Sequence, residues 1–148
     1  MGGKKRAPAA PSYRFFDHTG DFGVELAGRD AGALASALAR AWLDLFTGAP
    51  QAVAEVEARE VEVSGVDEAD LLVALGNELI YLFEVEKLLC ARFEPTACEP
   101  GRLRGVVHGE RFDPTRHPVA RPVKAVTHHG ARCEPHEAGW RGRIVFDL

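Results

Sequence analysis

The chain has 148 residues, enough for one domain, and 46% of them are hydrophobic, which excludes a disordered chain. Its net charge of −4 excludes an overall basic footprint for nucleic acid. No apolar run approaches the roughly 18 residues that a membrane span needs, so we expect no membrane association.

The N-terminal residues predict a flexible basic tail over 1–12 and a single domain over 13–148. Gly, Ala and Pro dominate the tail around Lys4, Lys5 and Arg6, and no apolar stretch follows that would make a signal peptide. The three cysteines are odd in number and include no Cys-x-x-Cys pair, which disfavours a disulfide framework and favours a cytoplasmic location.

Hydrophobic spacing in the first half predicts two strands and two helices. Alternation within 13–28 is typical of two short strands, with a loop or turn over 17–23 where glycines interrupt them. Apolar residues at helical spacing predict helices over 30–48 and 67–86, and 53–63 between them has the alternation of a strand.

The second half is extended throughout, and its candidate strands are 88–94, 102–109, 122–132 and 140–146. Helices early and strands late are typical of the α+β class rather than of an alternating parallel fold. We therefore expect a single α+β domain, a largely antiparallel β-sheet structure with two main helices packed on one face of the sheet.

Charge is divided unevenly between these halves. Residues 51–100 hold 3 positive and 12 negative side chains, whereas residues 101–148 hold 9 positive and 5 negative. A dipolar chain suits a charged protein partner at least as well as RNA, although ordinary solvated faces would give the same pattern.

The loop after the first strand is the first place where chemistry could occur. Asp17, His18, Thr19 and Asp21 bring two carboxylates, an imidazole and a hydroxyl within five residues. Such a set could bind a cation or transfer protons, but Asp and Thr also form ordinary turns by bonding to nearby backbone. Spacing alone leaves both interpretations open and favours the turn.

The C-terminus is the second place. Residues 143–148 alternate like a strand, and the chain ends with the Asp147 side chain next to the terminal carboxylate of Leu148. Two anionic groups at one point repel unless a cation or a basic group joins them, and hard ions take such oxygen clusters. A loose terminus with no ligand is the alternative.

The histidines of 122–129 are a third, weaker candidate. Adjacent residues of a strand point to opposite faces, so His128 and His129 cannot both bind one metal without a bulge. Together with His108 and Cys133 they match no zinc spacing, and we expect one inward histidine hydrogen-bonded in the core. Phosphate-binding loops and nucleophile elbows are absent from the sequence.

Taken in order, five segments resemble the archease family. The opening around Asp17-His18-Thr19-Gly20-Asp21 is similar to the family motif Asp-His-Thr-Ala-Asp-Ile-Gly, with Gly20 where Ala is usual. The other four segments are 77–83, 109–117, 123–129 and the final Asp147-Leu148, with His128 where Tyr is usual. Neither departure removes a charged group, and the resemblance covers nearly everything from 13 to 148.

The resemblance implies an activator of an RtcB-type RNA ligase, which joins RNA ends in tRNA splicing and RNA repair. Archeases promote guanylylation of a ligase histidine and support multiple turnover, so the chain would be an accessory protein and not an enzyme. The ligase would be its direct partner, and tRNA or another RNA an indirect one.

The resemblance also implies an acidic metal site made by Asp21, Asp147 and the terminal carboxylate of Leu148. Its all-oxygen ligands favour a hard divalent ion, Ca²⁺ first, with Mg²⁺ or Mn²⁺ as alternatives. The remaining residues that it implies in ligase activation are Asp17, His18, Lys124 and His129.

Two other classes of function stay open. A metal-dependent hydrolase could use Asp21, Asp147 and His18, but the sequence offers no general base beyond these groups and no clamp for a phosphate. An RNA-binding or chaperone-like module could use the basic final third, but aromatics interleaved with Lys and Arg are lacking there.

Overall fold

Both predicted helices are present in the computed structural model, which describes residues 10–18 and 21–148. They are α1 (Ala31–Thr47) and α2 (Glu68–Glu86). Asp30 and Asp67 cap their N-termini by accepting hydrogen bonds from backbone amides of the first turn. The apolar stripe predicted for α2 faces the core, since its leucines are buried: Leu71, Leu75, Leu79 and Leu82.

The strands form two antiparallel sheets. The four-stranded sheet has the order β1-β2-β7-β6, made of β1 (Ser12–His18), β2 (Asp21–Gly28), β7 (Gly139–Asp147) and β6 (Ala125–His136). The three-stranded sheet has the order β3-β5-β4, made of β3 (Glu57–Ser64), β5 (Arg102–Arg111) and β4 (Leu88–Glu99). A short 3-10 helix, η1 (Pro50–Ala52), follows α1.

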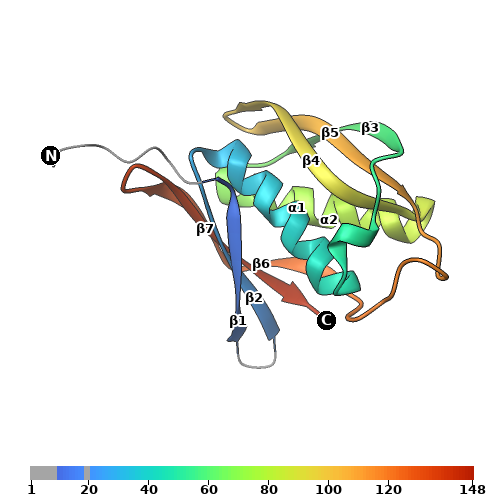
Figure 1. The fold of residues 1–148 in the computed structure, drawn as a ribbon. Helices are drawn as coiled ribbons and strands as arrows, with labels where there is room; N and C mark the ends of the chain where they lie inside the picture. The colour runs from blue at the N-terminus through green and yellow to red at the C-terminus, as the bar shows by residue number, and fades with distance from the viewer. Residues whose placement is uncertain (1–9, 19–20) are drawn as a thin grey trace, which may run out of the picture.

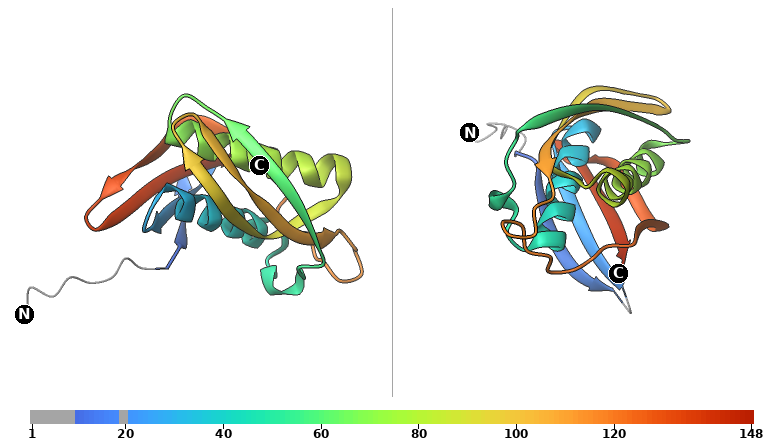
Figure 2. Two further views of the ribbon diagram at one scale, coloured as in Figure 1. Left: turned by 90° about the horizontal axis from the view of Figure 1, so that it is seen from above. Right: turned by 90° about the vertical axis from the view of Figure 1, so that its right-hand side faces the viewer.

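The two helices lie between the two sheets, as Figure 1 and the right-hand view of Figure 2 show. α1 packs against β2 of one sheet and β4 of the other, and α2 packs against β6, β3 and β4 (Figure 1). The α+β class, the antiparallel pairing and the two helices are confirmed. The expectation of one sheet was wrong, because α1 buries Ala and Leu around its whole circumference and so needs a covering layer on both sides.

The predicted loop or turn over 17–23 was too long, because the strand pairing of β1 with β2 continues into these residues. Asp17 pairs with Phe22, and His18 pairs with Asp21. Gly23, read from the sequence as an interruption, instead provides space: a Cβ there would fall 2.2 Å from Cζ of Phe16. The aromatic ring lies against the glycine backbone, which is a reason for Gly inside a strand.

Later strands run further than the sequence indicated. β4 continues through Pro95, where the register with β5 shifts between Pro95 and Ala97, so the proline marks a bulge rather than an end. Cys90, Cys98 and Cys133 are all free thiols. Within the described part of the chain, no helix is long and apolar enough to cross a membrane.

Candidate functional site

The predicted acidic residues meet at one end of the four-stranded sheet. The register of β2 with β7 pairs Phe22 with Phe146, and one residue further along are Asp21 at the start of β2 and Asp147 at the end of β7. The C-terminus lies at the hairpin end of the sheet in Figures 1 and 2. The backbone positions of the two aspartates are therefore neighbours, as the metal hypothesis requires.

Lys124 reaches the same end from the other side of β7. Its backbone N–H donates to the carbonyl oxygen of Asp147 at 2.8 Å, and its side chain is exposed, as are those of Asp147 and Leu148. Beside it the guanidinium of Arg121 lies over the ring of Phe22, 4.6 Å from the ring centre. Two cationic residues, Lys124 and Arg121, therefore lie at the same end of the sheet as Asp147.

Of the other residues predicted for this site, the structure describes the side chain of Asp17 but not those of His18 and Asp21. Asp17 is exposed on β1, one residue pair away from this end. The side chains of His18 and Asp21 lie outside the described residues, so the convergence of the carboxylates stays a prediction. Among the described side chains, no group of three or more His, Cys, Asp or Glu is arranged to hold a metal ion.

His128 and His129 lie in a bulge rather than in a regular strand. The register of β6 with β7 passes from Thr127–Val145 directly to Arg132–Arg143, so residues 128–131 are extra, and Gly130 has a φ of 73°. Both histidines are exposed, and His128 Nδ1 lies 3.2 Å from the carboxylate of Asp70. The expectation that one of them faces the core was wrong.

The histidine buried in the core is His117, in the long loop that leads to β6. Its Nδ1 accepts the backbone N–H of Asp113 at 2.9 Å, so the proton lies on Nε2, which donates to the Glu110 carboxylate at 2.9 Å. Glu110 also accepts the Ala54 amide at 2.7 Å and an ion pair from Arg116. The sequence contained both residues in one segment, yet only their spatial contact shows this role.

Asn77 holds the other end of that loop in place. Val126 lies on β6, the edge strand, and directs its N–H and C=O away from β7. The Asn77 amide satisfies both groups, accepting the N–H at 2.8 Å and donating to the C=O at 3.0 Å. The Asn77 side chain therefore makes the hydrogen bonds that a further strand would otherwise make to Val126. Val126 is two residues after Lys124.

Asn77→Ala is expected to lower the free energy of unfolding by about 2–3 kcal/mol, because it leaves two backbone groups of the buried Val126 without partners. Urea denaturation followed by circular dichroism measures the change. Glu84→Ala, on the exposed side of the same helix, is the control and should change it little. An equal effect of the two substitutions would contradict this role of Asn77.

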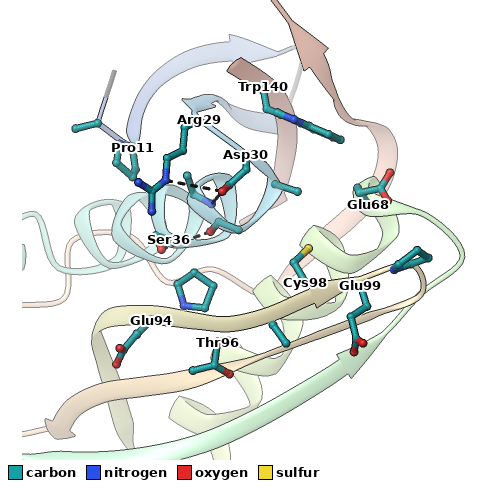
Figure 3. A pocket seen from close by; sticks show the side chains of 17 residues that line it. Pro11, Arg29, Asp30, Ser36, Glu68, Glu94, Thr96, Cys98, Glu99 and Trp140 are labelled. Carbon is teal, nitrogen blue, oxygen red and sulfur yellow. Dashed lines mark hydrogen bonds and ion pairs between the residues drawn. The ribbon is translucent and has the colours of Figure 1, made fainter. Parts of the chain in front are cut away.

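A groove lies at the opposite end of the molecule (Figure 3). Its volume is about 930 Å³, and it is lined by the start of α1, by β4 and by Trp140, which pairs with Gly28 at the far end of β2 and β7. Asp30 serves as a helix cap there, and partial burial raises the pKa of the Cys98 thiol, which disfavours a nucleophilic thiolate. The described lining residues offer no catalytic pair, so the acidic sheet end remains the candidate site.

Sequence comparison agrees with the resemblance to the archease family. The model of the Archease protein family (MTH1598/TM1083) matches residues 13–148. The protein archease of Pyrococcus furiosus is 31% identical over 140 residues, which cover 92% of this chain and 98% of that relative. The protein archease of Methanopyrus kandleri is 33% identical over 135 residues, which cover 89% and 96% of the two chains.

Solved structures share the fold. The solution structure of protein 1598 from Methanobacterium thermoautotrophicum has a TM-score of 0.77 and 26% identity, and the match covers 92% of this chain and 98% of that one. A crystal structure from Thermotoga maritima, described as an archease and possible chaperone, has a TM-score of 0.59 and 20% identity over 98% of each chain. The family model and the relatives together show that the chain belongs to the archease family.

Proposed function

We propose that this protein activates an RtcB-type RNA ligase, promoting its guanylylation and multiple turnover in tRNA splicing or RNA repair. One observation carries the proposal: the strand register brings Asp21, Asp147, the chain end and Lys124 to one edge of a sheet. The resemblance to archeases implies Asp21, Asp147 and Leu148 as metal ligands, and Lys124 as one of the residues that act in ligase activation. In this proposal the protein is an accessory factor and not itself an enzyme.

The donor set at this edge suits a hard divalent cation, Ca²⁺ first and Mg²⁺ or Mn²⁺ next. The exposed Asp147 carboxylate and the terminal carboxylate of Leu148 supply oxygens, and the Asp21 backbone lies at the neighbouring position of β2. Carboxylates gathered this closely repel, and a bound divalent ion would supply the neutralising charge. Asp21, Asp147 and Leu148 would hold the ion.

Lys124 would serve the ligase rather than the fold. Its backbone N–H is held by the bond to Asp147, while its side chain is exposed. A Lys in this position acts as a point charge that can pair with a phosphate or a carboxylate of the partner. The Asn77 clamp on β6 keeps that charge beside the acidic edge.

The test measures covalent transfer of labelled guanylate to the ligase of the same organism, with and without this protein. The unmodified protein should accelerate guanylylation and, alone, should leave GTP unchanged. Lys124→Ala should lower the accelerated rate about tenfold or more, because a charge-assisted contact is worth about 1.5–3 kcal/mol. Its unfolding midpoint should stay the same, since surface ion pairs contribute about 0–1 kcal/mol to stability.

Arg104→Ala is the matched control, because it removes one exposed positive charge from β5 in the other sheet. It should accelerate the ligase like the unmodified protein. Full acceleration by Lys124→Ala would remove Lys124 from the mechanism. Absence of any acceleration by the unmodified protein would reject the proposed function itself.

A further inference from the structure

A row of three arginines and one glutamate crosses all four strands of the β1-β2-β7-β6 sheet. Arg14 pairs with Glu25, Glu25 with Arg143, and Arg143 with Arg132. Residues directly opposite each other in antiparallel strands share a face of the sheet. The four side chains are therefore neighbours on one face, and we call them the arginine row.

This face is the one that the helices leave open. Val24 and Ile144, which precede and follow row members along β2 and β7, are fully buried against the helices. Because side chains alternate along a strand, the arginine row lies on the opposite face. The side chains of Arg14 and Arg132 are exposed, and Figure 2 shows both helices on a single side of the sheet.

The charges in the row do not balance. Arg14 forms an ion pair with Glu25 at 2.5 Å, which accounts for the only carboxylate in the row. Among the described residues, no carboxylate lies within ion-pair distance of Arg132 or Arg143. Like charges directly opposite each other destabilise a sheet, so the Arg132–Arg143 pair costs stability. Glu25, opposite Arg143 on β2, offsets only part of this cost, because it is already paired with Arg14.

Arg143 is also held in place. Its guanidinium lies 4.2 Å from the ring centre of Phe16, and that ring rests on the backbone of Gly23. A guanidinium stacked on an aromatic ring keeps its N–H donors at its edge, available to an incoming anion. The stack therefore positions a cation without neutralising it.

We propose that the arginine row binds the phosphodiester backbone of single-stranded RNA. Strands lie about 4.8 Å apart, so the row places guanidiniums along a track roughly 14 Å long. A nucleic acid strand offers a continuous series of anions along such a track, and Arg binds phosphate through its planar fork. The stacked Phe16 and Arg143 add a flat surface of the kind on which unpaired bases stack.

This surface goes beyond the proposed function and does not need the ligase. It lies on the same sheet as the acidic edge, since Arg143 is four residues before Asp147 on β7, or about 13 Å. RNA held on the row would be kept near that edge without entering it. The Lys4, Lys5 and Arg6 side chains are common to all variants below, so any binding by them cancels in the comparison.

The test is fluorescence anisotropy of a labelled twelve-nucleotide oligouridylate with the full chain, between about 50 and 200 mM salt. Arg132→Gln combined with Arg143→Gln should weaken binding about tenfold or more at the lowest salt. It should also reduce the slope of log affinity against log salt by about 1.4, because each phosphate contact on a single strand contributes about 0.7. Arg132→Gln alone, at a site with no packing role, should give about half that slope change.

Two further variants sharpen the result. Glu25→Gln removes the carboxylate from the row and should tighten binding severalfold. Arg102→Gln removes an arginine paired with Glu99 on the other sheet and should leave binding unchanged. A loss with Arg102→Gln equal to that with Arg132→Gln, or no RNA binding at 50 mM salt, would overturn the proposal. So would oligoglutamate binding as tightly with the same dependence on Arg132, which would assign the row to an acidic protein.

Discussion

Alanine in place of Glu110 is expected to lower the free energy of unfolding by about 3–5 kcal/mol, the usual cost of removing one member of a buried charged network. Glu110 is 6% exposed and accepts hydrogen bonds from the Ala54 amide, from Arg116 and from His117. Its loss leaves a buried imidazole N–H and a backbone N–H without acceptors.

The same network gives the protein an acid-sensitive part of its stability. Burial by itself raises the pKa of Glu110, but the hydrogen bonds from Ala54, Arg116 and His117 outweigh it and hold the pKa at about 2, below the usual 4.5. A lowered folded-state pKa means that this stabilisation is complete above about pH 4.5 and is lost as the pH falls toward 2. The urea midpoint of the unmodified protein should fall in that window.

In Glu110→Gln, the urea midpoint should fall less between about pH 4.5 and 2, because an amide does not titrate in that range. This variant should also be less stable than the unmodified protein at about pH 7. Glu134→Ala is the control: it removes a half-exposed glutamate paired with Arg141 and should cost no more than about 1 kcal/mol. If Glu110→Ala unfolds at the same urea concentration as Glu134→Ala, the network does not hold the loop.

The second large effect is expected from adding one residue after Leu148. The addition moves the terminal carboxylate away from Asp147 and should weaken Ca²⁺ binding by the protein alone about tenfold or more, which calorimetry measures directly. Acceleration of ligase guanylylation should fall with it. Asp147→Ala and Asp21→Ala should give the same losses, because in the proposal each supplies a ligand.

Leu148→Ala is the matched control, because it keeps the terminal carboxylate at its position and removes only a half-exposed side chain. It should bind the ion and accelerate the ligase normally. Normal Ca²⁺ binding by the extended chain would show that the terminal carboxylate is not a ligand. If both aspartate variants also accelerated the ligase normally, the acidic edge would have no part in activation.

Local sequence patterns were sufficient to predict those helices and strands whose apolar residues recur at a regular spacing. The spacing of Leu71, Leu75 and Leu79 predicted α2 because one helix face meets the core. The same reasoning could not find a second sheet, since hydrophobic spacing shows which residues are buried and not what covers them. The strand pairing at Asp17 was missed because glycines were read as a loop or turn, although Gly23 instead accommodates the ring of Phe16.

Individual residues of the candidate site could be predicted from motifs in the sequence. Contacts between residues that are far apart in the chain could not. Asp147 could be singled out because its carboxylate lies next to the terminal carboxylate and adjacent anions repel, and the family motif named Asp21. Neither the Glu110–His117 contact nor the row that joins Arg14 to Arg132 can be read from the sequence. Each depends on a register between strands that are far apart in the chain.

The bulge and the asparagine clamp on β6 also bear on whether another chain can add to this edge of the sheet. An open sheet edge with regularly spaced N–H and C=O groups is a template on which another chain can polymerise. Here Asn77 occupies both groups of Val126, and the extra residues 128–131 break the spacing that an incoming strand would have to match. The first part of the β6 edge is thereby poorly suited to strand addition, which disfavours fibril growth from it.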